Sequence, residues 1–403
     1  MRISTAQLYT TGVDGIERQQ AELLQTQQHI ATGRRVLTPA DDPVAAAQAI
    51  TLAQGKDQNS QYAANIDTAK SALSSNDSIL SQISDVLQSV RSSAVDGGNG
   101  VLANSDRMAI AGDVGARLQE LLGLANSKDG NGRYVFGGFQ TETQAFIGGG
   151  SGTIVYNGDQ GVRELQVASG RTLPISESGS TIFEHVRNGS GTVLTAAAGS
   201  NTGTGVAGAG QVITPAAING DRYSIQFHVS AGVTTYDIID ATTATTLSTG
   251  NAYTDGAAIN AGGLQFAVTG APADGDSFTM GPSGQQSIFT TLQQLVTTLQ
   301  APVSTAADRA KLANGIGRAL QDIDQALGNV LASRAGVGAS LRELDSLTSS
   351  NQDRGQQYSQ SLSILQDLDY NQALSDFSRQ QLALDAAQKS FVKISGLSLF
   401  NYL

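Results

Sequence analysis

The residues that most often do catalytic chemistry are scarce in this chain. It contains no cysteine, and its only histidines are His29, His185 and His228. A zinc site or a Cys/His nucleophile pair needs such residues close together in a defined geometry. Because each histidine stands alone in the sequence, we expect each at a surface or half-buried position. We therefore predict no catalytic site, no metal site and no cofactor.

Carboxylates close together in the sequence are a second possible source of chemistry, as general acids and bases. On a helix, however, side chains at i and i+2 do not share a face, and no apolar residues flank these pairs to raise a pKa. Solvated charge is the better interpretation, and Asp41 could instead cap a helix that begins at Pro43. The pairs are Asp41/Asp42, Glu343/Asp345 and Asp367/Asp369.

Two glycine-rich stretches could suggest phosphate or calcium binding. The sequence GGGSG at Gly148 lacks the Lys-Ser/Thr that a phosphate-binding loop needs. In DGNGR at Asp129, Arg133 stands where a calcium loop would need a further oxygen ligand. We interpret both stretches as turns.

The composition indicates which partners to expect. The 403 residues carry a net charge of -11, which disfavours binding to nucleic acid or to an anionic membrane. No run of apolar residues reaches the length of a membrane span or of a cleaved signal peptide. The absence of cysteine suits a protein that works outside the cell. We expect other proteins as partners, and export, if it occurs, without a cleaved signal.

The elements that would position any function are helices at both ends of the chain. Each end has apolar residues at heptad spacing among polar ones, and this stripe is too narrow to make a core alone. We therefore expect the ends to be frayed in the monomer and to become ordered when copies pack side by side. The predicted subunit-interface residues are Tyr9, Ile16, Leu23, Ile30, Tyr370, Phe377, Leu384, Phe391 and Ile394.

The sequence TPADDP, residues 38–43, interrupts the first helix, because each proline disfavours helical geometry in the residue before it. We predict a turn between domains here, with a second helix following it. The residues of this predicted turn are Pro39, Asp41, Asp42 and Pro43.

Longer heptad stripes predict two long helices further in, over 57–94 and 306–350. Their packing is open at this point, since they could form an intramolecular bundle or contact other copies. A third helix is predicted around 110–125 and a fourth around 288–299. The stripes are Ile66, Leu73, Leu80 and Leu87 in the first helix, and Ile316, Ile323, Val330, Val337 and Leu344 in the second.

Between residues 133 and 284 the pattern changes to short alternating strands separated by Gly, Asn and Asp. Strands are predicted at YVF from Tyr134, TIVY, RELQVA, RYSIQFHV, TYDIID, LQFAV and DSFTM. The stretch 189–210 is mostly Gly, Ala, Ser and Thr and predicts a flexible connection or a weakly packed loop.

The fold class is therefore α+β: long terminal coiled-coil helices pair into a rod, and a mainly β domain is inserted and faces outward. We predict three domains. They are residues 1–54 with 355–403, residues 55–188 with 285–354, and residues 189–284.

The start MRISTAQLY, the stretch 31–50 and the close, residues 365–403, resemble the flagellin family, as does YVFGGFQTETQAF from Tyr134. The resemblance is specific over 1–185 and 305–403. It implies a tube subunit of the bacterial flagellum, exported unfolded by the flagellar type III apparatus and located outside the cell. By position, residues 9–37 and 370–403 would form the coiled coil that lines the central channel.

Within this family, Pro43 directly after Asp41 and Asp42, and the ending SLFNYL, favour a subunit that joins hook to filament. The alternative is the flagellin filament subunit itself. As a junction subunit the chain would self-assemble into a ring. Its implied partners are the preceding hook-associated protein, flagellin and an export chaperone. A third possibility, an adhesin-like surface module, is left open for residues 190–284.

Overall fold

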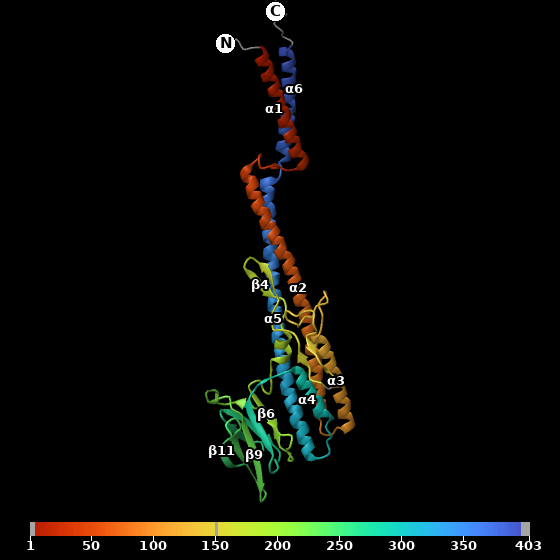
Figure 1. Cartoon of the computed structure of the whole chain (residues 1–403), viewed down its shortest axis with the longest axis vertical. Helices are drawn as coiled ribbons and strands as arrows, with labels where there is room; N and C mark the ends of the chain where they lie inside the picture. Colours follow the sequence, from red (N-terminus) through yellow and green to blue (C-terminus); the bar gives the residue numbers. More distant parts are fainter. Residues whose placement is uncertain (1–4, 150–151, 396–403) are drawn as a thin grey trace, which may run out of the picture. The chain divides into compact units, whose positions relative to one another are not determined.

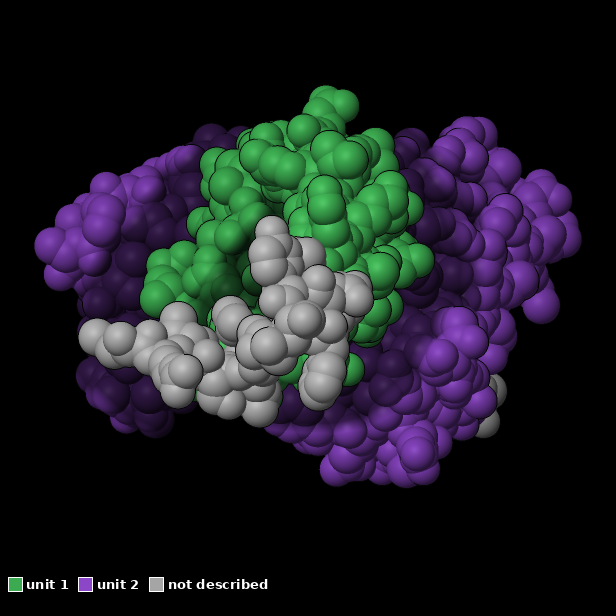
Figure 2. Space-filling model, turned by 90° about the horizontal axis from the view of Figure 1, so that it is seen from above, with its two compact units in different colours: residues 1–65, 346–403 green, residues 66–345 purple. Residues whose placement is uncertain are grey.

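The computed structural model describes residues 5–149 and 152–395 (Figure 1). The ending SLFNYL, residues 398–403, lies outside the described residues. The chain divides into two compact units, which Figure 2 colours separately. Unit 1 comprises residues 1–65 and 346–403, and unit 2 comprises residues 66–345.

Within residues 5–149 and 152–395 there are six α-helices, and two short helical turns lie in the strand region. The α-helices are α1 (Thr5–Thr32), α2 (Pro43–Gly97), α3 (Asn104–Ala125), α4 (Ile288–Gln300), α5 (Ala306–Gln366) and α6 (Tyr370–Ser395). The turns are the π-helix η1 (Ser180–Glu184) and the 3-10 helix η2 (Pro215–Ala217).

The strands occur between α3 and α4. They are β1 (Phe146–Ile147), β2 (Val155–Tyr156), β3 (Glu164–Ala168), β4 (Arg171–Pro174), β5 (Val186–Arg187), β6 (Val193–Ala197), β7 (Val206–Ala207), β8 (Gln211–Val212), β9 (Tyr223–Ser230), β10 (Val233–Asp240), β11 (Thr245–Ala252), β12 (Ala258–Ala261), β13 (Leu264–Thr269), β14 (Ser277–Pro282) and β15 (Gln285–Gln286).

In unit 2 the long heptad stripes form the core of a helical bundle. Leu80 and Leu87 of α2 and Ile323 and Val330 of α5 are almost completely buried. The fully buried Val114 and Leu121 of α3 and Leu292 and Leu295 of α4 extend this core. The inner stripes are therefore used within the chain, which answers the question that the sequence left open. The predicted helices around 110–125 and 288–299 are confirmed as α3 and α4.

An aromatic cluster connects α4 to the strands that follow α3. The rings of Phe146 and Phe183 lie 5.2 Å apart, and those of Phe183 and Phe289 stack at 5.6 Å. Phe136 packs edge-on against Phe183. Tyr134 forms an isolated bridge with Lys128 and belongs to no strand, so the predicted strand at YVF is wrong. The apolar YVF residues serve burial at this point and not strand pairing.

Two sheets make up the β module. One has the strand order β11-β10-β9-β14-β6, and the other the order β12-β13-β7 with β8 also paired to β13. Phe227, Phe266 and Phe278 belong to one buried cluster that both sheets contribute to. The predicted strands that correspond to β2, β3, β9, β10, β13 and β14 are confirmed.

The prediction of a flexible connection over 189–210 is wrong. Strand β6 in this stretch pairs with β14, and its Val193 is fully buried. The glycines allow close packing: a Cβ atom on Gly210 would lie 2.4 Å from Cγ1 of Val193, and one on Gly205 would lie 2.8 Å from the ring of Phe278. Small residues occur here because neighbouring chain segments approach closely.

Replacing Leu87 by Ala should lower the free energy of unfolding by about 2–5 kcal/mol, because the fully buried side chain would leave a cavity in the helical core. Chemical denaturation followed by circular dichroism measures this. Val101→Ala is the matched control: Val101 is 88% exposed, and a change of no more than about 0.5 kcal/mol is expected. Equal effects of the two substitutions would contradict this account of the core.

Candidate assembly surface

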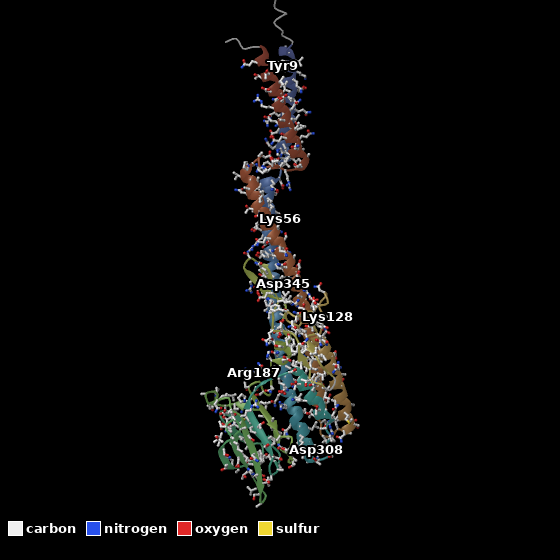
Figure 3. The ribbon with its side chains drawn as sticks, viewed as in Figure 1. Tyr9, Lys56, Lys128, Arg187, Asp308 and Asp345 are labelled. Carbon is white, nitrogen blue, oxygen red and sulfur yellow. The ribbon has the colours of Figure 1, made fainter. Side chains whose placement is uncertain are left out.

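The chain ends meet in unit 1, where α1 and α6 pack side by side (Figure 1). The rings of Tyr9 and Phe391 lie 5.0 Å apart, and Tyr9 is labelled in Figure 3. Opposite them Gly12 leaves room for the phenyl ring, since a Cβ atom there would lie 2.7 Å from Cδ2 of Phe391. A pair of aromatic residues and one glycine therefore hold these helices close together.

The predicted interface residues lie on this helix pair at intermediate or high exposure. Tyr9 and Tyr370 are 58% and 51% exposed. The side chain of Ile394 lies outside the described part. The stripes thus meet within one chain but are only partly covered, and a contact between copies stays a prediction. The half-buried members are Ile16, Leu23, Ile30, Phe377, Leu384 and Phe391.

Other apolar residues of unit 1, which sequence reasoning missed, expose more than half of their surface. On α6, Leu374 and Val392 share a face because their separation corresponds to about five helical turns. Leu382 is 72% exposed. The sequence signal that could have found these residues is an apolar side chain outside the heptad positions of a polar helix. The set comprises Leu24 of α1, Val44 and Ile50 of α2, Ile364 of α5, and Leu374, Leu382 and Val392 of α6.

Further along unit 1, α2 and α5 pair through an asparagine contact. The side-chain amide of Asn59 donates to the carbonyl oxygen of Asn351 at 2.9 Å, and the amide of Asn351 donates back to the carbonyl oxygen of Asn59 at 2.9 Å. Gly55 lies against the ring of Tyr358, 3.0 Å from where its Cβ atom would be. These polar and small residues fix how the two helices align.

The turn between α1 and α2 is shaped by its two aspartates. Oδ2 of Asp41 accepts hydrogen bonds from the backbone N–H groups of Leu37 and Thr38 at 3.0 and 2.8 Å. Oδ1 of Asp42 accepts from the N–H of Ala45 at 3.0 Å. Pro43 is the first residue of α2, so the N-cap position falls on Asp42. The expectation that Asp41 is the cap is therefore wrong, because Asp41 orders the loop before it.

Contacts across the chain hold this turn against the α5–α6 connection. The guanidinium of Arg35 forms an ion pair with Asp42 at 3.3 Å and donates to the carbonyl oxygen of Leu365 at 2.9 Å. The backbone of Leu368 donates to the carbonyl oxygen of Gly33 at 2.9 Å. Gly33 has a φ of 68°, which favours glycine. Pro39 and Pro43 are exposed and make the turn by conformational restriction alone.

Hydrogen bonding lowers the pKa of both aspartates. For Asp41 the main cause is the N–H groups of Thr38 and then Leu37, and for Asp42 it is the N–H of Ala45. Both carboxylates are thus held in the charged form, in which they accept these bonds. Their chemistry is structural, since a stabilised carboxylate at the surface is a poor general acid or base.

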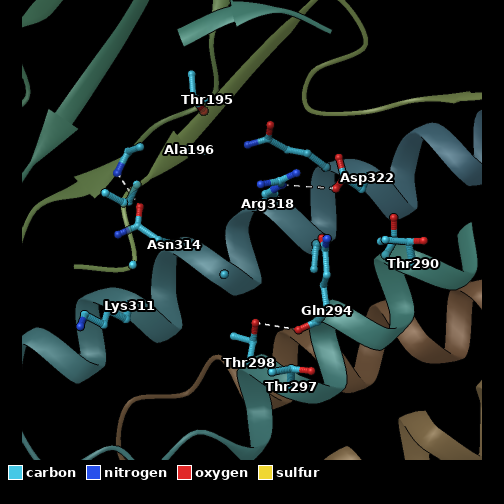
Figure 4. A pocket seen from close by; sticks show the side chains of 18 of the residues that line it. Thr195, Ala196, Thr290, Gln294, Thr297, Thr298, Lys311, Asn314, Arg318 and Asp322 are labelled. Carbon is cyan, nitrogen blue, oxygen red and sulfur yellow. Dashed lines mark hydrogen bonds and ion pairs between the residues drawn. The ribbon is translucent and has the colours of Figure 1, made fainter. Parts of the chain in front are cut away.

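A polar groove of about 480 Å³ in unit 2 lies between β6 and the helices α4 and α5 (Figure 4). Its charged wall residue Asp322 is only 3% exposed and accepts a hydrogen bond from the N–H of Gly189 at 2.6 Å. Arg318 lies 3.7 Å from Asp322. Burial raises the pKa of Asp322. Asn314 bonds both the N–H of Ala207 and the carbonyl oxygen of Gly205. Asp322 and Asn314 thus connect the groove wall to neighbouring backbone groups, while Nε of Arg318 has no hydrogen-bond partner among the described residues.

The remaining candidates for chemistry are dispersed. His29 contacts the carbonyl oxygen of Arg34 at 2.7 Å, and His228 lies 3.2 Å from Asp237. His185 lies beside Ser180. Within residues 5–149 and 152–395, no three His, Asp or Glu side chains gather as metal ligands would. In the same part of the chain, no helix is both long enough and apolar enough to cross a membrane.

The two other carboxylate pairs named in the sequence likewise make local contacts, and Asp367 accepts a hydrogen bond from the hydroxyl group of Ser363. Glu343 forms two bonds with Arg171, at 2.6 and 2.8 Å, and Asp345 pairs with Lys70 at 2.8 Å. Asp369 accepts from the N–H of Asn371 at 3.0 Å, at the start of α6. These contacts fix local structure.

Comparisons with known proteins agree with an assembly role. Residues 3–141 match the family described as the bacterial flagellin N-terminal helical region. The chain is 30% identical over 401 residues to flagellar hook-associated protein 3 of Salmonella typhimurium, and the match covers 99% of each chain. The chain belongs to the flagellar hook-associated protein 3 family.

Solved structures of this family share the fold. The crystal structure of FlgL from Xanthomonas campestris has 33% identity and a TM-score of 0.71, with 77% of this chain and 99% of that chain covered. The flagellar junction protein FlgL from Legionella pneumophila has 29% identity and a TM-score of 0.72, with coverage of 79% and 100%. The chain is therefore a structural component of the bacterial flagellum and not an enzyme, as the sequence predicted.

The α1–α2 turn should loosen in acid. Asp41 and Asp42 have folded-state pKa values below their ordinary value of 3.8, so their stabilising effect is full well above pH 3.8 and is lost as the pH falls through the lower folded-state values. Hydrogen exchange of the amides of Leu37, Thr38 and Ala45, corrected for intrinsic rates, measures this. In the double variant Asp41→Asn/Asp42→Asn these amides should exchange faster at neutral pH and lose the acid dependence. Unchanged protection across this range in the unsubstituted protein would contradict the assignment.

Proposed function

We propose that this member of the hook-associated protein 3 family joins the flagellar hook to the filament as an adaptor ring. Several copies would assemble around a central channel, with the preceding hook-associated protein on one side and flagellin on the other. The observation that carries the proposal is the helix pair α1–α6, whose apolar stripes are only partly covered within one chain.

The terminal helices would make the contacts between copies. Side chains such as Leu374, Leu382 and Val392 expose more than half of their surface on polar helices. Burial of apolar surface stabilises by roughly 25 cal/mol per Å², so a ring contact that covers these side chains and the stripes adds stability that the monomer lacks. The predicted interface from Tyr9 to Ile394 is part of this proposal.

The same proposal gives each predicted domain its own role. Residues 1–54 with 355–403 would form the inner tube, residues 55–188 with 285–354 a supporting shaft, and residues 189–284 an outward-facing module. The turn from Pro39 to Pro43 would set the angle between tube and shaft. The fully bonded Asp41 and Asp42 support this role, because they hold the turn in one conformation.

Passage through the flagellar type III apparatus in an unfolded state, together with an export chaperone, completes the proposal. A chain without cysteine forms no disulfide that would have to be opened before export or closed after it.

Deletion of the gene in its own bacterium tests the junction role. We expect hooks without filaments and free flagellin in the medium, because flagellin would be exported but would find no platform. Electron microscopy of the cells and immunoblotting of the medium provide the readout. Filaments that persist would refute the role. Loss of filaments without secreted flagellin would identify the chain as the filament subunit instead.

Replacement of Phe391 by Asp should abolish filament formation while leaving unit 2 folded. A charge would replace the ring that packs on Tyr9 and Gly12, and at this half-buried position it would lose the ring's apolar contacts and part of its own hydration. Leu384→Asp should act in the same way. Complementation of the deletion strain, with immunoblotting for secretion of each variant, measures the effect.

Ser390→Asp is the matched control for Phe391→Asp, since the neighbouring Ser390 is exposed and the change in charge is the same. It should support normal filaments. Normal filaments with Phe391→Asp would mean that this stripe is not an assembly contact.

A further inference from the structure

The sequence contains six Asn-Gly pairs, and an asparagine that precedes glycine is prone to lose its side-chain amide. In this reaction the backbone nitrogen of the glycine attacks the side-chain carbonyl carbon of the asparagine. Glycine favours the attack because it has no Cβ atom beside that nitrogen. The reaction needs a free N–H group, a side chain that lies close to it, and room for the chain to move. The six asparagines are Asn99, Asn131, Asn157, Asn188, Asn219 and Asn314.

The fold restrains Asn188 and Asn314 by hydrogen bonds. The N–H of Gly189, whose nitrogen would attack Asn188, donates to Oδ1 of Asp322 at 2.6 Å. Asn314 lies inside α5, where its side-chain amide donates to the carbonyl oxygen of Gly205 at 2.9 Å. Neither asparagine can therefore react before the structure around it opens.

Asn157 and Asn219 are restrained in other ways. Asn157 is half-buried, and the chain after it is tightly packed, because a Cβ atom on Gly158 would lie 2.5 Å from the hydroxyl oxygen of Tyr156. Asn219 is exposed, but its Oδ1 accepts a hydrogen bond from the hydroxyl group of Tyr223 at 3.1 Å. Both side chains would have to leave these positions to react.

Asn131 is exposed in a turn, but the nitrogen that would attack it is engaged. The N–H of Gly132 donates to the carbonyl oxygen of Asp129 at 2.9 Å. This bond would have to break before the nitrogen could approach the side chain.

Asn99 meets all three conditions in the exposed connection between α2 and α3. Among the described residues, the N–H of Gly100 donates to no acceptor. The N–H of Val101 donates to Oδ1 of Asn99 at 3.2 Å, which turns the side chain back toward its own backbone. The same bond polarises the carbonyl group under attack, as a donor to a developing oxyanion does. A Cβ atom on Gly100 would meet only Cδ of Arg309, at 3.9 Å, so the loop has room to move.

We propose that Asn99 is the residue at which the folded chain deamidates. The nitrogen of Gly100 gives its proton to a base in the solvent and forms a bond to Cγ of Asn99. The bond from Cγ to Nδ2 breaks, and Nδ2 takes up a proton and leaves as ammonia. Water then opens the cyclic imide. Cleavage at Cγ gives an aspartyl residue, whereas cleavage at the main-chain carbonyl carbon gives an isoaspartyl residue, whose backbone is longer by a methylene group.

The modification acts on the start of α3. The N–H of Leu102 donates to the carbonyl oxygen of Asn99 at 3.1 Å, and the carbonyl oxygen of Leu102 accepts from the guanidinium of Arg107 at 2.8 Å. Arg107 is only 1% exposed. A longer backbone at position 99 displaces the turn that holds Leu102, and either product adds a negative charge to the loop. Modification of one exposed residue thus weakens the support of a buried cation. This inference does not depend on the proposed junction role.

Peptide mapping by mass spectrometry of the purified full-length chain tests the proposal. The chain is incubated in mildly alkaline buffer, folded in one sample and denatured by guanidinium in another, and all six sites are followed over time. The denatured sample gives the intrinsic reactivity of each site. We expect Asn188 and Asn314 to react roughly tenfold or more slowly in the folded chain, because they need local opening. Asn99 should keep most of its intrinsic rate and be the fastest site. A faster reaction at any other site in the folded chain would overturn the inference.

Gly100→Ala tests the mechanism at the same site. Its methyl group hinders the attacking nitrogen, and we expect the reaction of Asn99 to slow by roughly an order of magnitude. Gly112→Ala is the matched control, because Gly112 is an exposed residue of α3 whose added Cβ atom would meet nothing within 4 Å. It should leave the rate at Asn99 unchanged, and circular dichroism checks that both variants fold. Equal rates at Asn99 in the two variants would refute attack by the nitrogen of Gly100.

Discussion

The burial of two apolar stripes, one on α2 and one on α5, is the constraint on which the structure of unit 2 depends. Leu80 and Leu87 of α2 and Ile323 and Val330 of α5 come from distant parts of the sequence and are covered almost completely. The part of the sequence between α2 and α5 contains α3, α4 and the β module, and these elements are built onto this pair of helices. Because heptad spacing keeps the apolar face on one side, the polar face can remain in solvent along the whole length.

Unit 1 uses the same heptad spacing with a different result. Its helices α1 and α6 are more polar, and stripe residues such as Leu23 and Phe377 remain half-exposed. Specific polar contacts take over the role of a core: Asn59 bonds Asn351 in both directions, and Arg35 connects the α1–α2 turn to the end of α5. Such contacts define alignment more than they add stability. The alignment of the helices in this unit is therefore defined, while many of its apolar side chains remain exposed.

Sequence periodicity predicted the helices well because their buried faces repeat regularly. It predicted the strands of the β module for the same reason, with alternating residues in β9 and β13. It failed where composition was ambiguous. The Gly- and Ala-rich stretch that contains β6 looked flexible, whereas the small residues permit close packing against Val193 and Phe278. Which of the two adjacent aspartates caps α2 also depended on where the helix begins. Because Pro43 is the first residue of α2, the cap is Asp42.

The predicted interface shows a deeper limit of sequence reasoning. A heptad stripe indicates that a helix packs against another helix, but it does not indicate whether that helix belongs to the same chain. Tyr9 and Phe391 meet within one chain, and Leu374 and Val392, outside the stripe, are the residues left exposed. Candidate contacts between copies are therefore read from the apolar surface that one chain leaves exposed, and only an assembly experiment assigns them, because singly exposed apolar side chains are common on protein surfaces.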